Sequence, residues 1–482
     1  MHASRILRFM GTLIFFLGIS MILPLMVALW YKETGTRSII YSILIACAAG
    51  VVLYYAAKRD EEKSLSHRDG VAIVTFGWVA AGLVSALPFM LSGAIPHFTD
   101  AYFESISGFT TTGASILANI EAVPRSLLMW RSLIQWLGGM GIIVLSIAIL
   151  PFLGVGGMQL YKAEVPSPVV DKLKPRISDT AKVLWKVYIL LTLMQIFLLI
   201  AGGMPLYDAV CHAFCTMPTG GFSTKNASLG HFNSPYFDTV VIVFMLLASI
   251  NFSLHYKFIK GNTGIFHRDP ECRFFLVLVA FFILAVTVNL YLTIYPSIGK
   301  AFRYAAFQVA SIISTTGFAT ADFDRWPGFS QTVLVLCMFL GGMAGSTAGG
   351  IKTMRIILLG KQAYLEIFRI IHPHAVTSLK LGGKPVPQEV MSGIWGFTLL
   401  YLSIFVVSAL IISALGLDAM SAFTAVAACV FNVGPGLGTV GPAQNFLAVP
   451  FLGKWVLIFC MLVGRLEIYT VLVLMMPEFW RK

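Results

Sequence analysis

Four short loops combine glycine with hydroxyl or amide side chains, and each lies between two apolar segments. In chain order they read Phe109-Thr110-Thr111-Thr112-Gly113-Ala114-Ser115, Met217-Pro218-Thr219-Gly220-Gly221-Phe222-Ser223, Ser314-Thr315-Thr316-Gly317-Phe318-Ala319-Thr320 and Asn432-Val433-Gly434-Pro435-Gly436-Leu437-Gly438. A dehydrated monovalent cation needs oxygen atoms in place of its water shell, and backbone carbonyls supply them where a loop runs extended along a pore. Glycine permits such a path because it adopts φ values that other residues avoid. The loops therefore predict a cation pathway lined by backbone oxygens.

The candidate ligands are backbone carbonyls at the loop glycines and just before them. They belong to Thr111, Thr112, Gly113, Thr219, Gly220, Thr315, Thr316, Gly317, Asn432, Val433 and Gly434. The loop glycines Gly113, Gly220, Gly317 and Gly434 are separated by 107, 97 and 117 residues. This spacing indicates a repeated unit of about one hundred residues.

A short stretch precedes each loop at nearly the same distance. Asp100-Ala101, Tyr304-Ala305 and Ser421-Ala422 begin 13 residues before their glycines, and Asp208-Ala209 begins 12 before Gly220. Asp and Ser are good N-caps, and a helix of roughly 12 residues is too short to cross a bilayer. The stretches therefore predict re-entrant pore helices whose negative C-terminal ends face the pathway. The alternative is that they are ordinary extracellular linkers.

A glycine-rich run interrupts the apolar segment 329–359. Half of residues 341–350 are glycine, and each glycine in a helix interior costs about 0.8–1 kcal/mol relative to alanine. We predict an intramembrane loop that forms a movable barrier below the four loops. Its residues are Gly341, Gly342, Gly345, Ser346, Thr347, Gly349, Gly350 and Lys352. The alternative is a helix whose small residues, at four-residue spacing, pack closely against a neighbour.

Arg465 is the only basic residue in the run from Trp455 to Met476. An arginine at that depth costs at least about 2.5–3.5 kcal/mol on insertion scales, so it should face water or a partner rather than lipid. Glu467 follows two residues later and would point to a different helix face. Arg465 is therefore predicted to place a positive charge in the pathway. The alternative is a structural role, in which its donors satisfy helix carbonyls or a buried acid.

Apolar segments that could position these residues run through the whole chain. The 482 residues are 57% hydrophobic and 12% charged, which is too apolar for one water-soluble core. Segments long enough to span a bilayer lie near 7–30, 38–57, 71–93, 126–150, 183–203, 236–259, 274–295, 329–359, 391–415 and 450–476. These ten predicted crossings place both termini on the same side.

The formal charge of +12 is distributed as expected for a membrane protein. Most Lys and Arg fall in segments that a cytoplasmic N-terminus would place in the cytoplasm, which is the positive-inside bias. We therefore expect a multi-pass protein of the bacterial cytoplasmic membrane, with both termini cytoplasmic and no nucleic-acid partner. The first apolar run lacks an A-x-A-like cleavage site and is predicted to be a retained span.

The predicted fold is an all-α polytopic membrane protein with two leading helices and four helix–pore-loop–helix repeats. The leading helices and a cytoplasmic linker occupy residues 1–69. The repeats occupy 70–153, 183–260, 273–360 and 390–482, and cytoplasmic linkers lie at 154–182, 261–272 and 361–389. We expect the repeats to surround one pore in a pseudo-fourfold arrangement.

Two other classes of protein stay open from the residues alone, a membrane enzyme and a purely structural membrane protein. Gly436-Leu437-Gly438-Thr439-Val440-Gly441 matches a dinucleotide-binding pattern but lacks the strand and the ribose-binding acid of a βαβ unit. His372-Pro373-His374 and the pair Cys211 and Cys215 have no clustered metal-ligating partners in the sequence. We expect no enzyme activity and no organic cofactor in this chain.

Taken together, the four loops, the two leading helices and Gly464-Arg465-Leu466-Glu467 resemble the membrane subunit of bacterial Trk-type potassium uptake systems, in the Trk/Ktr/HKT superfamily. The resemblance implies a potassium-channel-like architecture in which four non-identical repeats stand in for four subunits. Glycine in all four loops then implies potassium preference, whereas serine in the first loop accompanies sodium transport. Pro218-Thr219-Gly220 and Asn432-Val433-Gly434 depart from Thr-Thr-Gly, which predicts fewer well-formed ion sites than in a true potassium channel.

The same resemblance implies roles and partners that the residues alone do not give. Residues 341–350 would gate the pore, and Arg465 would repel cations below the loops. The partners would be a second copy of the chain and a cytoplasmic ring of nucleotide-binding regulatory subunits. Potassium is the expected transported substrate, with sodium or mixed transport as the alternative. Coupling of uptake to protons or sodium stays open.

Overall fold

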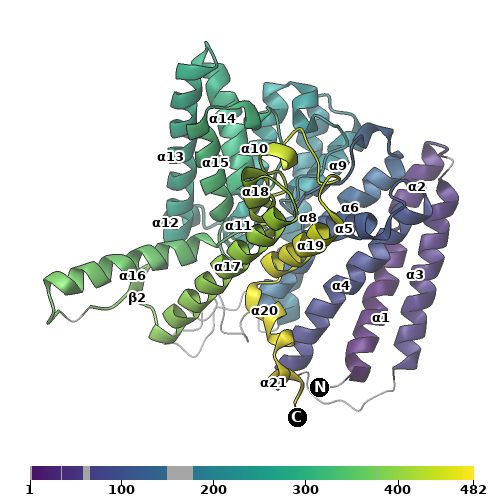
Figure 1. The fold of residues 1–482 in the computed structure, drawn as a ribbon, viewed down its shortest axis with the longest axis horizontal. Helices are drawn as coiled ribbons and strands as arrows, with labels where there is room; N and C mark the ends of the chain where they lie inside the picture. Colours follow the sequence, from purple (N-terminus) through teal and green to yellow (C-terminus); the bar gives the residue numbers. More distant parts are fainter. Residues whose placement is uncertain (1–2, 34, 58–65, 149–176, 376, 482) are drawn as a thin grey trace.

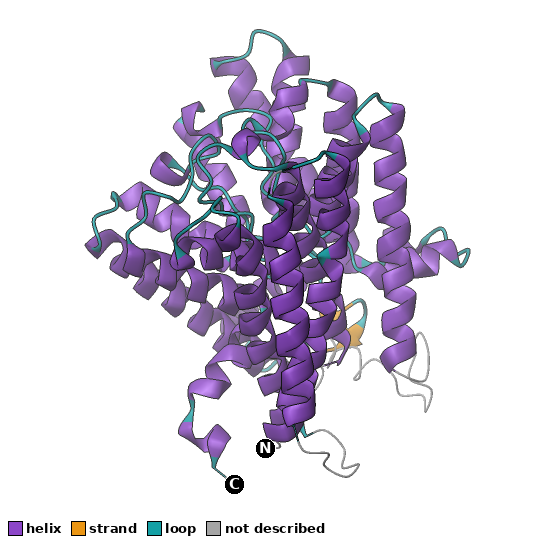
Figure 2. Cartoon of the chain, turned by 90° about the vertical axis from the view of Figure 1, so that its right-hand side faces the viewer, coloured by secondary structure: helices purple, strands orange, loops and turns teal. Residues whose placement is uncertain are grey.

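The computed structural model describes residues 3–33, 35–57, 66–148, 177–375 and 377–481. Helices make up nearly all of the regular structure (Figure 2). A short antiparallel pair, β1 (Lys380–Leu381) and β2 (Lys384–Pro385), is the only sheet in the described ranges. This agrees with the predicted all-α class.

The described helices can be assigned to the leading segment and the four repeats that the sequence predicts. The leading group contains α1 (Ala3–Ser20), α2 (Ile22–Trp30) and α3 (Thr36–Ala56). The first repeat contains α4 (His67–Leu91), α5 (Phe98–Phe109) and α6 (Arg125–Ala148), and the second contains α8 (Ile177–Ala201), α9 (Leu206–Thr216), α10 (Pro235–Ser249) and α11 (Phe252–Ile259). The third contains α13 (Pro270–Thr293), α14 (Ile298–Ile313), α15 (Gly328–Phe339) and α16 (Thr353–Ile371), with α12 (Ile265–Arg268) before it. The fourth contains α17 (Gln388–Ala414), α18 (Ala419–Val430), α19 (Phe451–Arg465) and α20 (Ile468–Leu472), followed by α21 (Pro477–Trp480).

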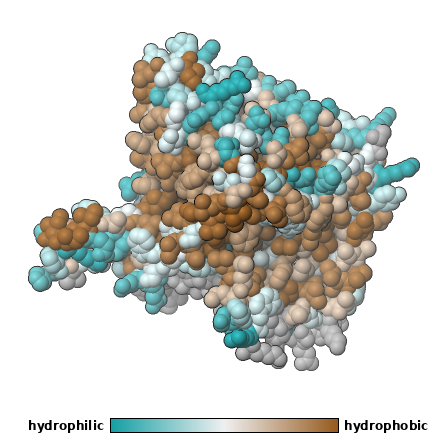
Figure 3. Space-filling model, in the orientation of Figure 1, coloured by the Kyte–Doolittle hydropathy of each residue, from teal (hydrophilic) through white to brown (hydrophobic). Residues whose placement is uncertain are grey.

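Long apolar helices identify the described chain as a multi-pass membrane protein. Six are long and apolar enough to cross a bilayer, and two bent helix pairs raise that number to eight. The other two predicted spans correspond to α6, whose last predicted residues lie outside the described ranges, and to the pair α15 and α16. Apolar side chains cover broad areas of the outer surface (Figure 3), as Val277, Phe281 and Leu284 do on α13. Lipid is the environment that makes such a surface stable.

Three predicted spans are interrupted, and the sequence predicted an interruption in only one of them, 329–359. Helices α10 and α11 meet at 103°, and α19 and α20 meet at 118°. The predicted span 329–359 contains a non-helical stretch, residues 340–352, between α15 and α16. At the first break Asn251 caps α11 by accepting a hydrogen bond from Ser253 N (2.8 Å), and at the second Glu467 has φ +61°. Such backbone is tolerated at membrane depth only where protein or water receives its polar groups.

Each of the short helices α9, α14 and α18 packs against a helix of the preceding repeat, and α5 packs against a helix of the fourth repeat. Helix α6 of the first repeat contacts α9 of the second, and α10 contacts α14 of the third. In turn α15 contacts α18 of the fourth repeat, and α19 contacts α5 of the first. Each repeat therefore supports the short helix of the next one, and the fourth supports that of the first.

The N-caps of three short helices differ from the prediction. The chain enters α5 at His97 and α9 at Pro205, so Asp100 and Asp208 lie within the first turns. The cap of α18 is Asp418, which accepts from Ser421 N (3.0 Å). The prediction placed each helix start about three residues too late, because acids are also favourable in a first turn, beside the positive end of the helix dipole.

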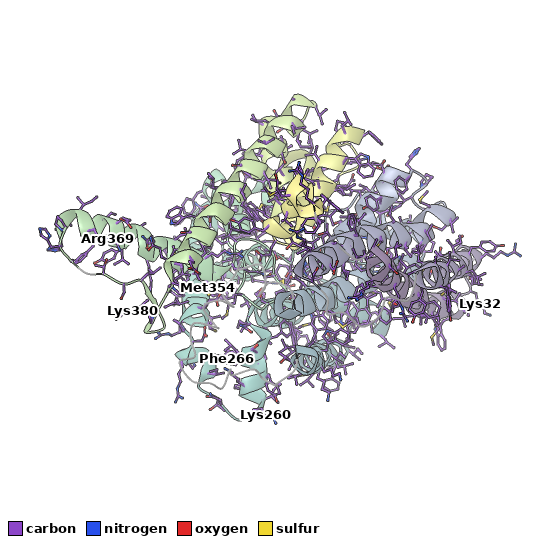
Figure 4. The ribbon with its side chains drawn as sticks, turned by 90° about the horizontal axis from the view of Figure 1, so that it is seen from below. Lys32, Lys260, Phe266, Met354, Arg369 and Lys380 are labelled. Atoms are coloured by element: carbon purple, nitrogen blue, oxygen red, sulfur yellow. The ribbon has the colours of Figure 1, made fainter. Side chains whose placement is uncertain are left out.

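Helix α16 projects away from the helical body, and its outer end lies far from the other repeats (Figure 1). It continues well past the predicted boundary at residue 360 and takes up part of the predicted linker 361–389. In the view from below, Met354 lies where α16 leaves the body and Arg369 lies near its outer end (Figure 4). Lys380, from β1, lies beside α16. Tyr364, Ile367, Ile370 and Ile371 are exposed on it.

Candidate cation pathway

The four loops that follow the short helices share one backbone conformation. A non-glycine residue with positive φ opens each, namely Thr111 (50°), Thr219 (57°), Thr315 (56°) and Asn432 (54°). Two positions later stands a glycine with positive φ, namely Gly113 (83°), Gly221 (74°), Gly317 (81°) and Gly434 (102°). Left-handed backbone is strained for residues with a side chain, so four occurrences at matching positions indicate a constraint imposed by the surroundings.

Each loop is tied to its short helix by the same hydrogen bonds. In the first loop the amides of Thr112 and Gly113 both donate to Ser107 O, at 2.9 and 3.5 Å. The matching acceptors are the carbonyls of Cys215, Ser311 and Ala428 in the other three loops. The local fold of the loop is therefore set by the C-terminal turn of the helix before it.

This backbone pattern shifts the sequence alignment of the second loop by one residue. The counterpart of Gly113 is Gly221, and Gly220 occupies the position of Thr112. Asp208-Ala209 then begins 13 residues before its glycine, as in the other three repeats. The uneven distance of 12 residues was the signal in the sequence that could have revealed this register.

The four loops also contact one another in chain order. A Cβ added to Gly113 would overlap the carbonyl oxygen of Gly220, and one added to Gly221 would overlap that of Thr316. A Cβ on Gly317 would overlap Val433 O, and one on Gly434 would lie 2.8 Å from Thr112 O. Only glycine fits at these four positions, and the contacts close a ring.

The carbonyls of the ring are buried and almost free of protein donors. No described residue donates a hydrogen bond to the carbonyl oxygens of Thr112, Thr316 or Val433, although these residues are fully buried. The fourth member, Gly220 O, accepts from Gln135 Nε2 at 2.6 Å. Buried carbonyls without a donor are costly in an apolar surrounding, so the ring presents oxygen atoms suited to a dehydrated cation.

A buried ion pair braces the outer side of the first two loops. Arg131 Nε lies 2.6 Å from Glu104 Oε1, and Glu104 also accepts from Ile116 N (2.9 Å). The other end of Arg131 donates to Ser223 O (3.1 Å). Because this pair joins the exit of the first loop to that of the second, it holds the two in a fixed relation. Sequence reasoning missed this arrangement, because Arg131 lies 27 residues from Glu104 and 92 from Ser223 in the chain.

The second glycine-rich feature, residues 340–352, lies directly against the ring and is called the intramembrane segment below. Thr347 O accepts from Thr219 Oγ1 (3.0 Å), and Thr315 Oγ1 accepts from Gly349 N (2.6 Å). A Cβ on Gly349 would lie 2.5 Å from Phe431 O. The segment therefore contacts the second, third and fourth loops.

Polar groups of the intramembrane segment form hydrogen bonds with neighbouring helices and within the segment itself. Glu271 Oε1 accepts from Ala344 N (2.9 Å) and Met354 N (3.1 Å), so it holds the segment and the first turn of α16 together. Lys352 Nζ donates to Ala348 O. Of the predicted gate residues, Gly341 and Gly342 also have bonded carbonyls, which accept from the side chain and the amide of Thr353.

Arg465 touches the same segment. Its Nη1 donates to Thr347 O (2.7 Å), whereas its Nε and Nη2 have no partner among the described residues. Glu467 is paired elsewhere, with Arg355 (2.6 Å), because it lies beyond the end of α19, at the bend into α20, and not on a second face of one helix as predicted. Arg465 therefore keeps an uncompensated charge beside the segment while also bonding to it, so features of both sequence interpretations are present.

In the described ranges no group of three or more His, Cys, Asp or Glu side chains could hold a metal ion. Cys211 and Cys215 are buried free thiols. His372 and His374 follow the end of α16 and are exposed. Together with Phe368 and Ile371 they line a shallow hollow of the surface.

The chain is similar along its whole length to proteins of one transport family. The family model TrkH, described as cation transport protein, matches residues 36–482. The Trk system potassium uptake protein TrkH of Salmonella typhimurium is 45% identical, with all of both chains covered. The uptake protein TrkG of Escherichia coli is 37% identical and covers 100% of this chain and 99% of its own.

A solved structure agrees with this assignment. The crystal structure of the potassium transporter TrkH from Vibrio parahaemolyticus matches with a TM-score of 0.92 and 40% identity, covering all of both chains. These relatives are named as transport proteins, which confirms that the chain is not a member of an enzyme family. By sequence and by fold, the chain belongs to the TrkH family of cation transport proteins.

Proposed function

We propose that this protein takes up potassium across the bacterial inner membrane through a filter formed by residues 111–113, 219–221, 315–317 and 432–434. The observation that carries the proposal is the closed ring of buried carbonyls, three of which have no donor among the described residues. The names of the relatives give the ion and the direction, since each is a potassium uptake protein. No other cation needs to be invoked to account for the ring.

The filter works by replacing the hydration shell of the ion. Carbonyl oxygens on four loops arrive from four sides in a pseudo-fourfold arrangement, and the C-terminal ends of α5, α9, α14 and α18 add their negative dipole ends. The ring of contacts in chain order supports this arrangement. Residues 66–148, 177–259, 270–371 and 388–472 then act as the four quarters of one pore.

The gate of this pathway is the intramembrane segment together with Arg465. The segment contacts three of the four loops from one side, so an ion leaving the filter meets it next. Arg465 adds a positive charge at Thr347. Movement of the segment would break several hydrogen bonds together, among them those that Met343 N and Thr347 donate to carbonyls in the last turn of α10.

The assembly that we propose has two further members, a second copy of the chain and a cytoplasmic ring of nucleotide-binding regulatory subunits. With both termini cytoplasmic, the projecting helix α16 lies on the side where such a ring would bind. Its exposed apolar residues Tyr364, Ile367 and Ile370 support a contact with another protein. The basic charge of the chain supports the orientation.

The test is ion-selective flux with the purified chain in liposomes, under opposed gradients of potassium and sodium. Potassium flux that exceeds sodium flux supports the proposal, and Gly113→Ser should raise sodium permeation relative to potassium. Equal flux of both ions in the unaltered chain would favour a mixed pathway instead. An unchanged permeability ratio in Gly113→Ser would remove the first loop from the filter.

A further inference from the structure

The second loop differs from the other three at one position. The first, third and fourth loops place Thr112, Thr316 and Val433 just before the glycine that has positive φ. All three have branched β-carbons. The second loop places Gly220 there, so a side chain is missing from one quarter of the ring.

The side chain of Gln135, from helix α6 of the first repeat, takes that place. It is fully buried, donates from Nε2 to Gly220 O (2.6 Å) and accepts from Phe222 N at Oε1 (3.2 Å). These two bonds fix the orientation of the amide, because each end has a partner of the required kind. Gln135 thus clasps the loop on both sides of Gly221.

Gln135 and a side chain at position 220 exclude each other. A Cβ added to Gly220 would lie 2.5 Å from Gln135 Oε1 and 2.7 Å from Nε2. In the first and third loops the hydroxyl at this position pairs with a hydroxyl two residues earlier, Thr112 with Thr110 and Thr316 with Ser314, both at 2.7 Å. Thr112 also accepts from Asn432 Nδ2 (2.9 Å). The glycine at 220 and the glutamine at 135 are therefore two halves of one arrangement.

The clasp changes the chemistry of the ring. A carbonyl that already accepts a strong hydrogen bond has less of its negative charge available for an ion, and selectivity depends on the number and field strength of the coordinating carbonyls. We propose that Gln135 is a specificity-determining residue that lowers discrimination between potassium and sodium by weakening one carbonyl of the ring. This inference rests on the filter proposed above.

The direct test exchanges the arrangement of the second loop for that of the third. The double variant Gln135→Ala with Gly220→Thr gives the second loop a Thr-Thr-Gly sequence and removes the donor to its carbonyl. The potassium-to-sodium permeability ratio, measured in liposomes, should rise about two- to tenfold, the range that the net worth of one hydrogen bond gives. An unchanged ratio in a conducting double variant overturns the inference.

A second variant covers the case in which the exchanged protein does not fold. Gln135→Leu keeps most of the volume and removes both hydrogen bonds without adding a side chain at 220. The ratio should rise here as well, because the carbonyl is released. A fall in the ratio would mean that Gln135 holds the loop rather than weakening its oxygen, and would overturn the inference.

Two controls separate this inference from the proposed filter. Gln195 is equally buried and donates to Thr216 Oγ1 (2.9 Å) on α9, away from the loop carbonyls. Gln195→Leu should leave the ratio unchanged, and an equal shift there would mark the effect as general loosening. Gly113→Ser reports on the filter itself: if it alters the ratio and the Gln135 variants do not, only the present inference fails.

Discussion

The loops of the proposed filter and the intramembrane segment are both non-helical, glycine-containing and buried in the protein. They differ in the hydrogen bonds that their carbonyl oxygens accept. In the filter, no described residue donates to the oxygens of Thr112, Thr316 and Val433. In the segment, Gly341 O accepts from Thr353 (2.8 Å) and Thr347 O from Arg465 (2.7 Å). Free oxygens receive an ion more readily than oxygens that already accept hydrogen bonds from protein donors.

Glycine serves a different purpose in each region. In the filter the glycines let neighbouring loops approach closely enough to bring their carbonyls together, as Gly317 does against Val433 O. In the segment, glycines let the two arms of the loop meet, as Gly341 does against Gly349 O, and let the segment approach its neighbours, as Gly349 does against Phe431 O. Glycine content alone therefore does not distinguish an ion site from a barrier. The partners of the carbonyls do.

The largest effect that we expect follows from adding a methyl group inside the filter. Gly221→Ala would push its Cβ into Thr316 O, and the resulting shift should reduce potassium flux by about a hundredfold, as a 1 Å misplacement can. The matched control is Gly93→Ala, which has nearly the same φ (75° against 74°) but an empty surrounding. If both variants lose flux equally, backbone strain rather than loop contact is responsible.

The next effect concerns the charge beside the segment. Arg465→Gln removes the charge but can still donate to Thr347 O. In general, two unit charges about 8 Å apart at an effective dielectric of about 20 repel by about 2 kcal/mol. An effect of that size corresponds to a rise of about thirtyfold in resting potassium flux. Arg465→Lys keeps the charge and should stay near the original flux. Flux is measured per folded molecule, and a well-folded Arg465→Gln protein with normal flux would exclude the electrostatic barrier.

Shortening the intramembrane segment should have a smaller effect, because Arg465 stays in place. Deletion of residues 345–349 removes the contacts with Thr219 and Thr315. If the lost obstruction is worth about 1.4 kcal/mol, flux without an activating partner should rise about tenfold. A stable, inserted protein with unaltered flux would identify the segment as a packing surface.

The smallest effect should come from the acid that holds the segment at both ends. Glu271→Gln replaces charge-assisted bonds to Ala344 N and Met354 N by neutral ones, a loss of about 1 kcal/mol, and resting flux should rise about fivefold. Asp269→Asn is the control, since Asp269 caps α13 through Cys272 N and is not bonded to the segment. If Asp269→Asn raises the resting flux as much as Glu271→Gln does, the bonds from Glu271 to the segment are not the cause of the rise.

The four candidate loops could be recognised in the sequence because their signals are local. Each loop contains its own glycine and its own threonine or asparagine, and the short helix before it can be recognised from a dozen residues. The register of the second loop was harder, since Gly220 and Gly221 are adjacent and either could be aligned with Gly113. Only the backbone angles and the shared acceptor Cys215 O separate them.

The sequence by itself determined the membrane class and the family, because hydrophobicity, glycine and charge bias are properties of the residues in place. The tertiary structure decided which polar groups meet. Gln135 reaches a loop 85 residues away, and Arg465 bonds to Thr347 across 118 residues. Buried polar groups must find partners wherever the fold brings them, and the choice between several possible partners depends on how the helices pack. For that reason only the tertiary structure distinguished the carbonyls of the proposed filter that lack a protein donor from the carbonyls of the segment that accept hydrogen bonds.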